Sequence, residues 1–189
     1  MVIEMKIVHP IKDVKKIESM KRVLRERNLR DLLLFVMGIN TALRVSDLLS
    51  LKVGDVQDGK GKFRNFVILR EAKTGKVKQF PLNDSVLKVL REYISSEMDD
   101  GTYLFSSAKG GAISRVQAYR ILNGAATRVG IEAVGTHTLR KTFGYHAYRK
   151  TRNLALVQKL LNHNSSGDTL RYIGIDQEDM DAAYLKLNL

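Results

Sequence analysis

The sequence predicts a mostly α-helical domain with one small antiparallel β-sheet, and three observations lead to this fold class. Apolar residues recur at helical spacing over most of the chain, and only two short runs are rich in aromatic and β-branched residues. The 189 residues suffice for one hydrophobic core. A hydrophobic fraction of 44% beside 28% charged residues is typical of a globular protein rather than a disordered one.

The first helices are predicted on either side of Asn28. Residues 11–28 show helical spacing opposite a charged face, and a dense apolar stretch fills residues 29–39. Asn28 is suited to cap the second, deeply buried helix, because its side chain can accept a backbone N–H. A short third helix is expected over residues 41–51, ended by Gly54.

The two strand-like runs cover residues 63–69 and 77–81. They flank Lys73-Thr74-Gly75-Lys76, whose glycine suits a tight turn, so they predict an antiparallel hairpin. Helices are then expected over residues 83–97, 114–129, 136–150, 154–162 and 169–173. The helix at residues 114–129 is expected to turn Val116 and Tyr119 inward, and residues 179–187 are compatible with a last helix.

The formal net charge of +12 indicates a polyanion-binding protein, and nucleic acid is the commonest such partner. Residues 136–172 concentrate the charge, with Asp168 as their one acid against Arg140, Lys141, Arg149, Lys150, Arg152, Lys159 and Arg171. The tail at residues 176–189 is acidic, so we expect it to dock on protein rather than on DNA.

Several classes are excluded or disfavoured. The chain has no cysteine, which rules out disulfides, zinc ribbons and thiol nucleophiles and makes the cytoplasm the expected compartment. Its longest apolar run, residues 32–39, is too short to cross a bilayer, so no membrane partner is expected. Residues 1–30 lack the pattern of a signal peptide.

Two strings carry the residues that could perform chemistry. The first is Thr41-Ala42-Leu43-Arg44-Val45-Ser46-Asp47-Leu48-Leu49. The second begins with His137-Thr138-Leu139-Arg140, continues through Leu161-Asn162-His163 and ends with Thr169-Leu170-Arg171-Tyr172. In these strings the sequence resembles the tyrosine recombinases of the phage integrase family, and the resemblance spans roughly residues 29–175. The matching positions are Arg44, His137, Arg140, His163 and Tyr172, with Lys73 matching the family's hairpin lysine.

The resemblance implies DNA cleavage and rejoining through a 3′-phosphotyrosyl intermediate, with Tyr172 as the nucleophile. Arg44 and Arg140 would stabilise the charge that develops on the phosphate, so neither a metal nor a cofactor is implied. By family analogy His137 takes or positions the tyrosine proton, Lys73 protonates the departing 5′ oxygen, and His163 hydrogen-bonds the phosphate.

Individual positions leave alternatives. Lys76 and Lys78 compete with Lys73 for the general-acid role, and the chain has Tyr145, Tyr148 and Tyr184 as rival tyrosines. His146 is expected to pack or lie on the surface. Ala42 and Asn162 stand where the family often has glycine, and Asp47 stands where it often has glutamate, with an expected role in supporting an arginine.

The expected organisation is an N-terminal helical segment at residues 1–28, an integrase-type catalytic domain at 29–175, and a tail at 176–189 that can form a docking helix. Most family members carry a separate DNA-clamping domain before the catalytic one, and 28 residues are too few for it. The chain is therefore read either as a compact member or as a catalytic fragment.

The function predicted is site-specific DNA recombination, in the integration or excision of a mobile element. The alternatives are a type IB topoisomerase-like enzyme that relaxes DNA, and a DNA-binding relative without strand exchange. Expected partners are double-stranded DNA at a recombination site, further copies of the chain on paired sites, and accessory proteins. The expected location is the cytoplasm, on the nucleoid when the protein is bound to DNA.

Overall fold

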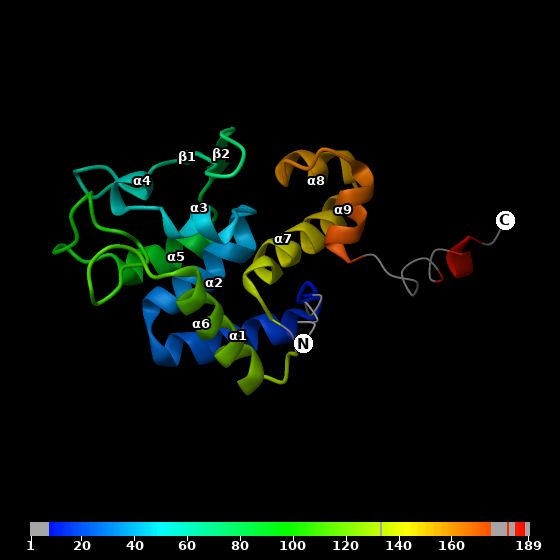
Figure 1. Ribbon diagram of the computed structural model, residues 1–189, viewed down its shortest axis with the longest axis horizontal. Helices are drawn as coiled ribbons and strands as arrows, with labels where there is room; N and C mark the ends of the chain where they lie inside the picture. Colours follow the sequence, from blue (N-terminus) through cyan, green and yellow to red (C-terminus); the bar gives the residue numbers. More distant parts are fainter. Residues whose placement is uncertain (1–7, 133, 175–180, 182–183, 188–189) are drawn as a thin grey trace, which may run out of the picture.

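The computed structural model describes residues 8–132, 134–174, 181 and 184–187. These residues form a mostly helical fold with one two-stranded antiparallel sheet (Figure 1), which confirms the predicted fold class. The elements, in chain order, are α1 (Val14–Arg27), α2 (Leu29–Thr41), α3 (Val45–Leu49), α4 (Val53–Val56), β1 (Phe66–Arg70), β2 (Val77–Pro81), α5 (Asp84–Tyr93), α6 (Arg115–Arg128), α7 (Thr136–Thr151), α8 (Leu154–Leu160) and α9 (Ser166–Ile173).

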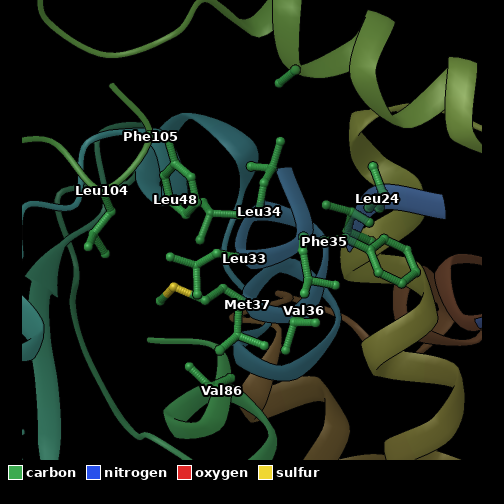
Figure 2. Packing of buried hydrophobic residues seen from close by; sticks show 14 of the residues in the cluster. Leu24, Leu33, Leu34, Phe35, Val36, Met37, Leu48, Val86, Leu104 and Phe105 are labelled. Carbon is green, nitrogen blue, oxygen red and sulfur yellow. The ribbon is translucent and has the colours of Figure 1, made fainter. Parts of the chain in front are cut away.

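Helix α2 is the centre of the hydrophobic core. Its apolar residues from Leu32 to Met37 are all buried, and α1, α5 and α7 pack around it (Figure 2). A helix that is apolar on every face is stable only when it is enclosed in this way. Asn28 ends α1 and begins α2, and its side chain accepts the backbone N–H of Arg30, as the sequence predicts.

A close crossing of α2 and α7 fixes where the second sequence string lies. A Cβ added at Gly38 of α2 would fall 2.3 Å from Cδ1 of Leu139, so a larger residue there would force α7 away. Because Arg140 follows Leu139 directly, the missing side chain at Gly38 brings this arginine close to the C-terminal end of α2.

Helices α8 and α9 are held on α7 by a second, smaller apolar cluster. Its buried members are Ala42, Val157, Leu161 and Ile173, and Tyr172 packs against its edge. The nucleophile proposed from the sequence therefore sits on a short helix whose position depends on few apolar contacts.

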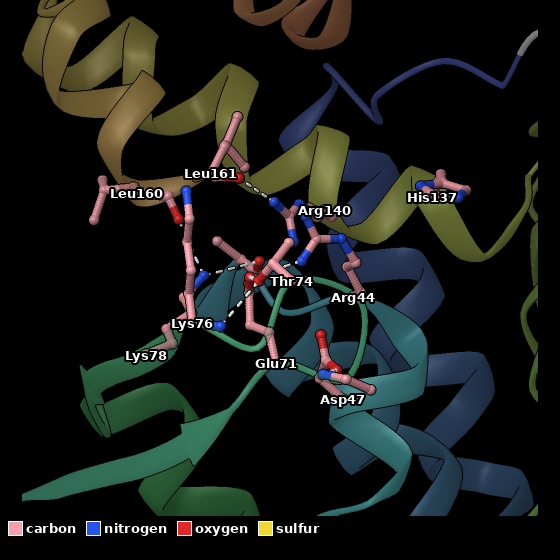
Figure 3. Close-up of polar contacts among 12 residues, drawn as sticks. Arg44, Asp47, Glu71, Thr74, Lys76, Lys78, His137, Arg140, Leu160 and Leu161 are labelled. Atoms are coloured by element: carbon pink, nitrogen blue, oxygen red, sulfur yellow. Dashed lines mark hydrogen bonds and ion pairs between the residues drawn. The ribbon is translucent and has the colours of Figure 1, made fainter. Parts of the chain in front are cut away.

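The hairpin of β1 and β2 is paired in the register Val67–Phe80 and Leu69–Lys78. Val67, Lys78 and Phe80 are buried, whereas Phe66 and Val77 on the opposite face are exposed. Lys78 is the charged side chain on the inner face of the two strands, and it points toward α8 (Figure 3).

Several local predictions are wrong. Gly54 lies inside α4 rather than ending a helix, and α9 begins at Ser166 rather than at residue 169. Residues 41–51 do not form one helix, because Ala42 adopts a left-handed backbone and α3 begins only at Val45. Helix α5 ends at Tyr93 rather than at residue 97. Val116 and Tyr119 of α6 are 58% and 45% exposed, since this helix buries its alanine-rich face instead.

Of the predicted helix at residues 179–187, the structure describes residues 181 and 184–187, and residues 181 and 184–186 are helical; the rest lies outside the described residues. Within the described part, Tyr184, Leu185 and Leu187 are exposed. Among the helices that are described, none combines the length and the apolar character needed to cross a bilayer.

Candidate active site

All six residues predicted for the site line one open cleft of about 730 Å³. They come from five separate parts of the chain: the start of α3, the hairpin turn, the first turns of α7, the segment after α8, and α9. The residues are Arg44, Lys73, His137, Arg140, His163 and Tyr172.

The two arginines converge on one buried carboxylate, that of Glu71 at the end of β1 (Figure 3). Arg44 Nη1 lies 2.9 Å from Glu71 Oε2, and Arg140 Nη1 lies 3.9 Å from Oε1. Thr74 in the hairpin turn donates its hydroxyl to Oε2 at 2.7 Å. The carboxylate thereby links the hairpin to both arginines.

Glu71 is ionised in this arrangement. Burial alone would raise the pKa of its carboxyl group, but hydrogen bonds from Thr74, Arg44 and Asn162 outweigh burial and lower the pKa. A buried anion between two guanidinium groups holds them close together despite their mutual repulsion.

Arg140 is nearly fully buried and keeps an uncommitted donor. Its Nη2 donates to the carbonyl oxygen of Leu161, just after α8. Its Nη1 makes no hydrogen bond within the described part of the chain. An unmet N–H of a buried guanidinium is costly, and an anionic phosphate oxygen in the cleft would satisfy it.

Tyr172 faces His137 across the cleft. Its hydroxyl oxygen lies 3.4 Å from His137 Nδ1, a long contact of the kind that tightens when substrate binds. Burial raises the pKa of the Tyr172 phenol to about 12, although Arg140 and Arg44 oppose this shift. Burial, followed by the charges of Arg140 and Lys141, lowers the pKa of His137. At neutral pH the pair is therefore a neutral phenol beside a neutral imidazole that can accept its proton.

His163 packs edge-on against the Tyr172 ring, with 4.8 Å between ring centroids. Its Nδ1 lies 3.2 Å from Thr169 Oγ1, whose own hydroxyl donates to the carbonyl of Ser165. Thr169 must then accept from His163 Nδ1–H, which leaves Nε2 for the cleft. Burial lowers the pKa of His163, which favours the neutral imidazole, and a phosphate in the cleft would oppose this shift by stabilising the cation.

The structure separates the rival lysines. Lys73 and Lys76 are exposed on the hairpin turn and line the cleft, whereas Lys78 is buried and does not. Lys78 is therefore not in position to protonate a leaving group in the cleft, and Lys73 and Lys76 both remain candidates. Among the described tyrosines, Tyr172 lines the cleft and Tyr148 does not.

The prediction for His146 is confirmed, whereas the role predicted for Asp47 is wrong. His146 packs as expected, with Nε2 2.9 Å from the carbonyl of Ile11. Asp47 is buried, but its carboxylate accepts the backbone N–H of Ala72 rather than an arginine N–H. Glu71 takes the arginine-supporting role expected of Asp47.

Sequence reasoning missed the roles of Glu71 and of the backbone at Ala42 and Asn162. Both of the latter adopt positive φ, 56° and 51°, at the positions where the family often has glycine. The glycine that the family often has at these two positions was a signal for a left-handed backbone, because glycine enters this region without steric cost. Among the residues that the structure describes, no group of three or more His, Asp or Glu side chains is placed to hold a metal ion.

The cleft brings together a tyrosine, two histidines and two arginines, a set of side chains that can perform phosphoryl transfer. The chain belongs to the phage integrase family, whose model matches residues 12–179. It is by sequence a tyrosine-type site-specific recombinase.

Among its relatives is the probable integrase/recombinase YoeC of Bacillus subtilis, 46% identical over 181 residues, an alignment that covers 95% of this chain and 97% of the relative. Tyrosine recombinase XerA of Pyrococcus furiosus is 28% identical over 92% of this chain. The chain spans 60% of the length of that XerA.

Solved structures share the fold at low identity. The crystal structure of XerA recombinase superposes with a TM-score of 0.76 at 20% identity, over 97% of this chain and 67% of that one. A lambda integrase dimer bound to a COC′ core site gives a TM-score of 0.68 at 18% identity, over 90% of this chain and 50% of that one.

Proposed function

We propose that this protein cuts and rejoins DNA at a specific site through a covalent 3′-phosphotyrosyl intermediate on Tyr172, in the integration or excision of a mobile element. The observation that carries the proposal is the placement of the Tyr172 hydroxyl 3.4 Å from His137 in a cleft that Arg44 and Arg140 also line. Membership of the phage integrase family supports it.

In the cleavage step, Tyr172 Oη forms a bond to phosphorus and the bond from phosphorus to the 5′ oxygen breaks. His137 takes the phenolic proton, which is necessary because the pKa of this phenol is about 12. A hairpin lysine, Lys73 by family position, gives a proton to the 5′ oxygen. Rejoining reverses these transfers, so the ester keeps the energy of the broken bond and no nucleotide cofactor is consumed.

The two arginines bind the non-bridging oxygens, on which negative charge accumulates in the transition state. Guanidinium groups suit this task because their donors match two oxygens at once. The shared contact with Glu71 holds both in place before DNA arrives, so little reorganisation accompanies the reaction. His163, once it takes a proton from solvent and the phosphate stabilises the cation, would donate its Nε2–H to the same group.

We further propose that the protein acts on paired DNA sites as an assembly of several copies, with accessory proteins as further partners. The lambda integrase structure described above, a dimer on its core site, supports self-association. Exposed Tyr184, Leu185 and Leu187 offer apolar side chains for such contacts. The proposed organisation is an N-terminal helical segment at residues 1–28, a catalytic domain at residues 29–175 and a tail at residues 176–189. The proposed location is the cytoplasm, on the nucleoid when the protein is bound to DNA.

The proposal is tested by covalent trapping. A binding site is selected from randomised DNA duplexes, and the enriched sequence is rebuilt with a nick beside the scissile phosphate, so that the cleaved strand diffuses away. Protein joined to DNA on a denaturing gel is the expected result, and its absence would contradict the proposal.

The rival activity is separated on a second substrate. A type IB topoisomerase-like enzyme would relax supercoiled plasmids lacking the selected site, whereas a recombinase would exchange strands only between plasmids that carry it. A DNA-binding relative would shift the selected duplex without trapping it.

A further inference from the structure

A buried lysine outside the cleft joins two helices that carry the site. Lys78 of β2 is 9% exposed, and its Nζ donates to the carbonyl oxygens of Ala42 and Leu160, each at 3.0 Å (Figure 3). Ala42 is the C-terminal cap of α2, and Leu160 is the last residue of α8. One ammonium group therefore bridges the C-terminal ends of two helices.

The bridge is chemically well matched. The last carbonyls of a helix lack partners within the helix and lie at its negative end, where a cation is favoured. A lysine ammonium has three N–H donors, so it can serve two carbonyls at once. Buried lysines without such partners are rare because burying the charge is costly.

The segment after α8 is held from several sides. Lys78 binds the carbonyl of Leu160, and Arg140 binds the next carbonyl, that of Leu161. The backbone N–H of His163 donates to the carbonyl oxygen of Gln158. Lys78 also holds Ala42, two residues before Arg44. Its two contacts thus tie the backbone leading to Arg44 to the backbone leading to His163.

We propose that Lys78 is a positioning residue for DNA cleavage, fixing the segments that bear Arg44 and His163 relative to each other. This inference rests on the proposed function. Lys78 acts through these neighbours and not on the DNA, because it does not line the cleft.

The charge of Lys78 is less important than its donors. Burial and the nearby charges of Arg140 and Arg44 lower the pKa of Lys78 to about 8, while Glu71 and Asp47 oppose the shift. A neutral amine still has two N–H groups, one for each carbonyl. Both hydrogen bonds therefore persist above and below this pKa, and the cleavage rate should not follow the titration of Lys78.

The test compares two variants of Lys78 with a matched control. Lys78→Met keeps the length of the side chain and removes all donors, whereas Lys78→Arg keeps donors on a larger group. Lys78 and Leu160 border a second cavity of about 430 Å³, which gives the guanidinium room. Gln79→Met changes the next residue of the same strand, which is exposed. Melting temperature and DNA affinity are measured for each protein.

The readout is the single-turnover rate of adduct formation on the nicked duplex at saturating protein, well below every melting temperature. We expect Lys78→Met to lower this rate by about 100-fold, the effect of displacing a catalytic group by about 1 Å. DNA affinity should change little, Lys78→Arg should recover most of the rate, and Gln79→Met should match the parent protein.

A double-mutant cycle separates positioning from general stability. If Lys78 works through His163, then Lys78→Met should cost far less in a His163→Gln background than in the parent background. The same loss in both backgrounds, or an unchanged rate in Lys78→Met while the parent forms adduct, would overturn the assignment of Lys78 alone. Failure of the parent protein to form any adduct would overturn the proposed function and this inference with it.

Discussion

The hydroxyl of Tyr172 on α9 lies 3.4 Å from Nδ1 of His137 at the start of α7, although the two helices belong to separate parts of the chain. The first prediction concerns this contact. Tyr172→Phe should abolish the covalent adduct and leave DNA affinity unchanged, because it removes only the attacking oxygen while the ring keeps its packing against His163. Tyr148→Phe, in the same apolar cluster but away from the cleft, is the control. Protein-linked DNA from the Tyr172 variant on a denaturing gel would refute the assignment.

The second prediction concerns the arginines. Arg44→Ala should raise the barrier to cleavage by about 3–4 kcal/mol, which is a rate loss of several hundred-fold, while DNA affinity falls far less. Arg44→Lys should restore little, since an ammonium cannot present two parallel donors. Arg22→Ala removes an exposed charge from α1 and serves as the control. A loss of only a few-fold in the single-turnover rate would reduce Arg44 to a DNA-positioning contact.

The third prediction is a pH profile. Because the pKa of His137 is lowered and that of Tyr172 is raised to about 12, the second-order rate of adduct formation should rise through mildly acidic pH and then stay level across neutral pH. His163→Gln separates the contribution of the other imidazole. In His137→Ala the level region should disappear, and the rate should climb with pH as the phenol itself ionises. A climbing rate in the parent protein would show that His137 is not the base.

The fourth prediction concerns Glu71. Its pKa is lower in the folded state than in the unfolded chain, so its contribution to stability is present above the unfolded pKa and is lost as pH falls through the folded pKa. Glu71→Gln should destabilise the fold at neutral pH by about 3–5 kcal/mol, because it leaves the guanidinium groups without their anion. The difference from the parent should shrink in acid. Urea unfolding in a series from neutral pH down through the acid range measures the difference at each pH; a difference that does not shrink in acid would contradict the pKa shift.

The fifth prediction concerns the acidic tail. Truncation after residue 175 should change assembly on paired sites or the regulation of cleavage, and should leave the affinity for a single site nearly unaltered. The physical reason is the reversed charge of residues 176–189, which DNA repels and a protein surface can accept. Analytical ultracentrifugation with DNA, together with adduct formation on single and paired sites, tests it. A truncated protein that matches the full chain in every measurement would show that the tail does not dock.

The helices and the six cleft residues were predictable because each depends on local signals. Asn28 is a capping residue before a long apolar run, and Arg44 and Tyr172 lie in strings with defined spacing. The role of Glu71 was not predictable, since a carboxylate at a strand end gives no sign of whether it is buried. Val116 shows the same limit, because the structure buries the small alanines of α6 in preference to this larger side chain. Tertiary packing decided both cases.

The N-terminal segment is fastened to α7 over a long sequence separation. Lys141 donates to the carbonyl of Val8, the N–H of Ile11 donates to Thr142, and His146 lies against the carbonyl of Ile11. During synthesis the segment before α1 leaves the ribosome ahead of α7, so these bonds form only after α7 has been made. The ion pair of Glu71 with Arg140, and the hydrogen bond from Lys78 to α8, likewise form only after the later partner has been made. Among the cleft residues Tyr172 on α9 is made last, so the cleft is complete only once the chain as far as α9 has been synthesised.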